Sequence, residues 1–171
     1  MQMVKKLFIA LFFVWLILLF FMPKQEMYYK LENALVKYDI KMNEARIEEG
    51  LFSLTLHKVD VYAKGIKLAT IEKVQCFTLL FYTKMEIANL LLDDSLKSMA
   101  PTQIEKVTAT HFLGLPWTVA LNADGSFGGT EGQVNLKSKM LRLDFNSTKG
   151  IEMLQNQLKQ DEKGWYYETS F

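Results

Sequence analysis

From Ile40 onward the chain repeatedly alternates apolar and polar residues, a period of two that is typical of β-strands with one buried face. Near the end of the chain, for example, Leu141, Leu143 and Phe145 alternate with polar residues. Gly, Asn and Asp residues interrupt the pattern every ~8–12 residues, as turns between short antiparallel strands do. The sequence therefore predicts a mainly β fold with flanking helices, in which residues 40–171 form a curved antiparallel β-meander domain.

A one-residue slip interrupts this alternation early in the β region. Leu54 and Leu56 keep the period before the slip, and Val59 and Val61 keep it afterwards. A β-bulge inserts one extra residue into a strand and shifts the period in this way. We therefore expect a bulge near His57 or Lys58.

Two helices are expected to flank the strands. Residues 24–39 carry apolar residues at helical spacing, which predicts a short amphipathic helix connecting the N-terminal segment to the β domain. Ile151, Leu154 and Leu158 have the same spacing and predict a helix near residues 149–159. With 171 residues and no long linker, the chain is expected to form one domain plus these small additions.

The N-terminal segment 1–23 is strongly apolar. Lys5 and Lys6 precede an uninterrupted apolar run of 16 residues, from Leu7 to Met22. A membrane-crossing helix needs ~20 such residues, but flanking lysines and bilayer thinning can close the gap. A cleaved signal peptide is the alternative, yet the run ends at Pro23 without the small-residue cleavage pattern. Residues 1–23 are therefore predicted to be an uncleaved signal anchor, which is a transmembrane helix.

The lysines also suggest an orientation for this anchor. Lys5, Lys6 and the free amine favour a cytoplasmic N-terminus. The anchor is thus predicted to cross a membrane once and to place residues 24–171 outside the cytoplasm. The net charge of +1 shows no basic excess, so a nucleic-acid partner is not expected.

Four glycines lie close together between Gly125 and Gly132. Phosphate-binding loops require Gly-Lys-Ser/Thr after a spaced glycine, or Gly-x-Gly-x-x-Gly between a strand and a helix. Neither pattern occurs, and strand-like segments lie on both sides. Asp124-Gly125 is instead typical of a β-hairpin turn. We interpret the stretch as a hairpin, with no phosphate-binding role.

The other reactive side chains show no catalytic or metal-binding pattern. The single cysteine, Cys76, lies in an apolar run and is expected to be a buried, inert thiol. His57 and His111 are far apart and are expected to be structural strand residues. Asp93-Asp94 fits the N-cap of a short helix better than an acid–base pair. The chain is accordingly predicted to be non-enzymatic, without cofactors or metals.

One short motif matches an acceptor sequence for covalent modification. Asn146-Ser147-Thr148 is an acceptor for N-linked glycosylation, and Asp144, two residues before the asparagine, extends it to the longer bacterial acceptor pattern. Asn146 is therefore a candidate glycosylation site.

Several features together resemble the type II secretion system protein N family, which is itself similar to AsmA-like envelope proteins. They are the N-terminal segment ending in MPKQ, the segment PTQIEKVTATH and the hairpin ADGSFGGTEGQVNL. Most of the likeness lies in the hairpin, at Gly125, Phe127, Gly128, Gly132, Val134 and Leu136. The resemblance implies a protein that crosses the bacterial inner membrane once, with a cytoplasmic N-terminus and a periplasmic C-terminal domain whose β-sheet curls around an apolar groove.

Two functions follow from these observations as hypotheses. The first is a structural or assembly component of an envelope machine, such as a secretion system or a flagellar motor accessory structure, with protein partners and the inner membrane. The second is a lipid-binding or lipid-transfer protein that holds its ligand in an apolar groove. The run from Phe77 to Tyr82 motivates the second hypothesis, because a strand with two apolar faces needs a cover on each.

Overall fold

The computed structural model describes residues 2–20, 23–79, 81–96, 103–146, 158–162 and 164–171. Two α-helices, α1 (Gln2–Phe20) and α2 (Lys24–Val36), precede the strands, and a short 3-10 helix, η1 (Asp94–Leu96), follows the fourth strand. The strands are β1 (Ile40–Glu49), β2 (Ser53–Ala63), β3 (Ile66–Leu79), β4 (Tyr82–Leu92), β5 (Gln103–Phe112), β6 (Thr118–Gly125), β7 (Gly128–Asn135), β8 (Met140–Phe145), β9 (Lys159–Asp161) and β10 (Gly164–Ser170).

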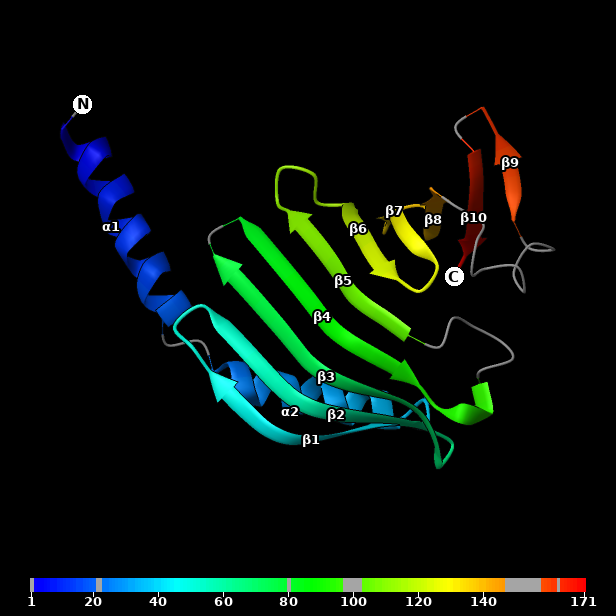
Figure 1. The fold of residues 1–171 in the computed structure, drawn as a ribbon. Helices are drawn as coiled ribbons and strands as arrows, with labels where there is room; N and C mark the ends of the chain where they lie inside the picture. Colours follow the sequence, from blue (N-terminus) through cyan, green and yellow to red (C-terminus); the bar gives the residue numbers. More distant parts are fainter. Residues whose placement is uncertain (1, 21–22, 80, 97–102, 147–157, 163) are drawn as a thin grey trace.

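All ten described strands belong to one sheet in the order β1-β2-β3-β4-β5-β6-β7-β8-β10-β9. Every pairing is antiparallel, and consecutive strands are neighbours except where β10 lies between β8 and β9. Figure 1 shows the sheet bent and twisted, with α2 alongside β1 and β2 and α1 projecting away from the strands. The expectation of a β-sheet is confirmed.

The two faces of the sheet differ in chemistry. One face, which we call the apolar face, carries Leu56, Val59 and Ile71, and Tyr28 of α2 packs against them in a buried cluster. Farther along the same face, Phe127 and Leu158 form a second buried cluster. The opposite side, which we call the polar face, carries the ion pairs that Glu86 forms with Lys84 and Lys106.

A crease crosses the sheet from β1 to β5. On each of these strands one residue has no register partner on the neighbouring strand, and we call it a skipped residue. The skipped residues are Ala45, Lys58, Glu72, Asn89 and Glu105. Lys58 and Asn89 have positive φ angles of 51° and 52°, and β6 skips no residue opposite Glu105, so the crease ends there in a bulge. The β-bulge predicted near His57 or Lys58 is therefore wrong: β2 and β3 each skip one residue there and keep the same register, and the register shift between these strands lies at Val61 and Tyr62.

The crease explains how residues three positions apart share a face. In a regular strand, Leu56 and Val59 would point to opposite sides. The skipped Lys58 shifts the alternation by one residue, so both side chains enter the same buried cluster. Ile71 and Val74 on β3 are related in the same way around Glu72.

Helix α2 contacts the sheet through buried Tyr28 and through Lys24, whose ammonium group lies 3.4 Å from the Glu49 carboxylate of β1. Tyr28 is its buried residue, and the Tyr28 hydroxyl donates a 2.7 Å hydrogen bond to Glu44 of β1. Burial, followed by the neighbouring Glu44 carboxylate, raises the pKa of Tyr28, so the phenol stays protonated and remains a donor. The amphipathic helix predicted for residues 24–39 is therefore present as α2, which ends at Val36.

Helix α1 corrects the prediction made for residues 1–23. Within the described residues, no helix is long and apolar enough to cross a membrane. Lys5 and Lys6 lie inside α1, and its apolar part, from Leu7 to Phe20, is shorter than the ~20 residues that a span requires. The prediction of a signal anchor is therefore wrong. The predicted single-pass placement in the bacterial inner membrane, with a periplasmic domain, is not supported either.

The structure also bears on two smaller predictions, the hairpin around Gly125 and the helix near residues 149–159. The β6–β7 hairpin exists, but Gly125 pairs with Gly128, so Ser126 and Phe127 form the turn and Asp124-Gly125 ends the strand. Most of the helix predicted near 149–159 lies outside the described residues. Of its last two positions, Leu158 is buried and Lys159 begins β9.

Candidate functional site

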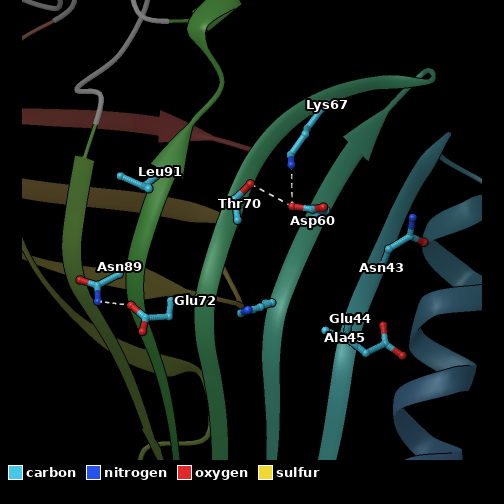
Figure 2. Close-up of a pocket in the computed structure, with 10 residues that line it drawn as sticks. Asn43, Glu44, Ala45, Asp60, Lys67, Thr70, Glu72, Asn89 and Leu91 are labelled. Atoms are coloured by element: carbon cyan, nitrogen blue, oxygen red, sulfur yellow. Dashed lines mark hydrogen bonds and ion pairs between the residues drawn. The ribbon is translucent and has the colours of Figure 1, made fainter.

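A hollow of about 740 Å³ opens over the crease on the sheet, between β1 and β4. Figure 2 shows the side chains that line it, among them Asp60, Lys67, Thr70, Glu72 and Asn89. The hollow follows the crease, because four of the five skipped residues line it: Ala45, Lys58, Glu72 and Asn89.

Charged groups in this hollow bind one another. Lys67 lies 2.8 Å from the Asp60 carboxylate, and Thr70 donates a 2.9 Å hydrogen bond to the same oxygen (Figure 2). Lys67 and then Thr70 lower the pKa of Asp60. Asn89 donates to Glu72 across the neighbouring strands. A ligand would have to compete with these existing contacts, so the hollow is a weak candidate for a binding site.

The stronger candidate is a continuous band on the apolar face. Two neighbouring register rows form this band, which we call the apolar band, and neither contains a charged residue. The central row consists of Leu54, Cys76, Met85, Ala109, Leu121, Gly132, Leu143 and Tyr167. The second row consists of Leu56, Val74, Ile87, Val107, Ala123, Thr130, Phe145 and Trp165.

The central row is covered incompletely. Each of its members is at least partly exposed, and the Met85 side chain on β4 is 40% exposed. The buried clusters lie at the two ends of the band, around Tyr28 at one end and around Phe127 and Leu158 at the other. The middle of the band is thus an apolar surface that lies between two covered regions.

The residues considered from sequence do not converge on one site. Cys76 was expected to be buried, but it is a free, half-buried thiol in the central row of the apolar band. His57 on β2 lies 3.4 Å from Glu48, and His111 on β5 lies 3.2 Å from the carbonyl of Pro116. In the part of the chain that the structure describes, no group of His, Cys, Asp or Glu is arranged to hold a metal ion.

Asp93 and Asp94 occupy the start of η1, where the Leu96 amide donates to the Asp93 carbonyl at 2.9 Å. This position agrees with the predicted helix cap.

Asn146 is exposed directly after β8, and its backbone N–H donates a hydrogen bond to the backbone carbonyl of Gly129. Ser147 and Thr148 lie outside the described residues, so glycosylation of Asn146 stays a prediction.

Sequence reasoning missed Thr130. Its side chain is 5% exposed, and among the described residues its hydroxyl oxygen has no hydrogen-bond partner. Thr130 stands in a glycine-rich polar stretch, which gives no local sign of burial. Its register partners, Ala123 and Phe145, reveal that it faces the apolar side.

No family model matches the chain, and no curated protein or solved structure matches it either. The resemblance to the type II secretion system protein N family therefore stays a prediction.

Proposed function

We propose that this chain binds the acyl chains of a lipid along the apolar band. The observation that carries the proposal is the central row, which crosses the sheet from β2 to β10 without a charged residue and without a fully buried member. It lies between two buried clusters, and beyond Leu54 the row meets the charged Glu49 of β1, where the apolar surface ends.

Covering this surface with hydrocarbon is favourable in free energy. Removing apolar surface from water contributes about 25 cal/mol per Å², so covering exposed side chains such as Met85 is favourable. Backbone groups of the strands already pair within the sheet, and the central row therefore offers hardly any polar group to a ligand.

An extended peptide fits the same surface poorly. A peptide lying on the face of the sheet would bury its own amide and carbonyl groups, which cost free energy unless they find partners. An acyl chain has no such groups along its length. The chemistry of the band therefore favours a lipid over an extended peptide.

A charge placed in the middle of the band tests this proposal. Met85→Glu puts a carboxylate in the central row, and we expect it to weaken binding of a fluorescent long-chain acyl ester at least tenfold. The matched control is Thr110→Glu, which puts the same charge on the polar face, where Thr110 pairs with Lys84. Fluorescence titration of both variants measures the effect. Equal loss in the two variants, or no binding by the wild type, would contradict the proposal.

A role in a protein assembly is the second candidate, and α1 is the observation that favours it. Large apolar side chains are exposed along this helix from Met3 to Phe20. Trp15 stacks on Phe81 of the β3–β4 turn, with the ring centroids 5.9 Å apart. A helix with exposed apolar side chains is suited to a hydrophobic groove on a protein partner.

Site-specific crosslinking separates this second role from lipid binding. A photo-crosslinker at Phe12 of α1 should give one discrete protein adduct, and the same group at exposed Lys137 should give none. Loss of the Phe12 adduct in a Trp15→Ala variant would show that the position of α1 matters. Identical adduct patterns from both sites would rule this candidate out.

A further inference from the structure

Thr130 carries the one hydroxyl group in the second row of the apolar band. It lies between Ala123 of β6 and Phe145 of β8, and these neighbours pack against Phe127 and Leu158. Its hydroxyl is buried and has no hydrogen-bond partner among the described residues. A buried hydroxyl without a partner carries a free-energy cost, which a hydrogen bond to an acceptor on a ligand would remove.

The surroundings of Thr130 define the chemistry of that ligand group. Neither row of the band contains a charged residue, so a carboxylate at this place would be buried without a cation. A neutral carbonyl oxygen needs only a donor, and the Thr130 hydroxyl is one. The ester group of an acyl lipid supplies such an oxygen together with a hydrocarbon chain.

We infer that the Thr130 hydroxyl donates a hydrogen bond to the ester carbonyl of the bound lipid and so fixes which end of the ligand lies at β7. The acyl chain then runs along the band toward Met85 and Cys76. Because the Thr130 hydroxyl is buried, the carbonyl reaches it only by displacing part of the packing of Phe127 and Leu158 against Ala123 and Phe145. This inference rests on the proposed function, because it assumes that the band binds a lipid.

The test compares two ligands and two variants in the full chain. Methyl laurate carries an ester and dodecane does not, and both displace a fluorescent acyl probe if they bind to the band. Thr130→Val removes the hydroxyl and keeps the shape, whereas Thr130→Ser keeps the hydroxyl. We expect Thr130→Val to bind methyl laurate about five- to tenfold more weakly, the size of one hydrogen bond, and to bind dodecane unchanged.

Other measurements keep the test decisive. Thr130→Ser should retain most of the affinity for methyl laurate, and ligand-free Thr130→Val should have the same or a higher Tm, because an unpaired hydroxyl is lost. Equal affinity of wild type and Thr130→Val for methyl laurate would overturn this inference and leave the proposed function standing. Failure of the wild type to bind either ligand would instead overturn the proposed function itself.

Discussion

At the scale of single residues, Gly132 shows how tightly the apolar band is built. A Cβ atom at this position would lie 2.5 Å from Leu143 Cδ2 and 2.6 Å from the carbonyl oxygen of Arg142. The backbone carbonyl cannot rotate away while β7 and β8 stay paired. We therefore expect Gly132→Ala to lower the free energy of unfolding by about 1–3 kcal/mol, as overpacking does, measured by urea denaturation.

Gly129→Ala is the matched control on the same strand. There, the nearest atoms to an added Cβ are side-chain atoms of Asp124 and Asn146, at 3.3 and 3.4 Å, and they can move aside. We expect a change below about 0.5 kcal/mol, typical of a surface substitution. If the two alanine variants were equally stable, close packing at Gly132 would not be the reason for its glycine.

Glu86 gives a prediction about acid stability. Its carboxylate lies 2.7 Å from Lys106 and 2.7 Å from Lys84, and these lysines lower the pKa of Glu86 from 4.5 to about 2. Between these pH values the unfolded chain binds a proton that the folded chain does not, so the stabilisation is complete above pH 4.5 and is lost as the pH falls toward 2.

Replacing Glu86 should therefore flatten this part of the stability profile. We expect Glu86→Gln to lose about 0.2–1 kcal/mol at neutral pH, the range for exposed ion pairs, and to approach the wild type near pH 2. Chemical denaturation at several pH values measures the difference, with Glu131→Gln on β7 as the control. A difference that persists undiminished at the lowest pH would show that the ion pairs are not its source.

At the scale of elements, the crease determines which side chains enter the core. Lys58 adopts a left-handed backbone conformation, which costs a non-glycine residue roughly 1–2 kcal/mol. We expect Lys58→Gly to stabilise the fold by about 0.5–1 kcal/mol, because glycine takes this conformation without strain. Lys73 on β3 has no positive φ angle, and Lys73→Gly should destabilise by a similar amount. Thermal unfolding should show a higher Tm than wild type for Lys58→Gly and a lower Tm for Lys73→Gly. A loss of stability in Lys58→Gly would contradict this account of the crease.

The crease could be predicted from the sequence only in part. On β2, the slip between Leu56 and Val59 was visible because both residues lie in one short segment. Its continuation to Asn89 and Glu105 depends on the register between strands, which no single segment encodes. Strand positions were predictable for the same local reason, whereas the hollow over the crease was not.

At the scale of the whole molecule, the apolar band arises from side chains that the chain spreads over many strands. The alternation of Leu141, Leu143 and Phe145 with polar residues predicts that the three share one face, and Leu143 and Phe145 lie in the band. The burial of Thr130 was not predictable, because Phe127 and Leu158, which cover its neighbours, come from distant parts of the sequence. The N-terminal apolar run predicts a membrane span from its composition, but no helix among the described residues is long and apolar enough to cross a membrane.

The central claim is that a lipid covers the middle of the apolar band, and Cys76 measures this directly. It is the single cysteine of the chain and lies in the central row next to Met85. Its rate of alkylation should be compared in the absence and presence of a long-chain acyl ester. The control is a Cys76→Ala, Gln75→Cys variant, which moves the thiol to the polar face, because successive strand residues point to opposite sides.

We predict that the ester slows alkylation of Cys76 severalfold and leaves the thiol at position 75 unaffected. Equal rates at Cys76 with and without the ester, at ester concentrations that saturate binding, would contradict the claim that the lipid lies along the apolar band.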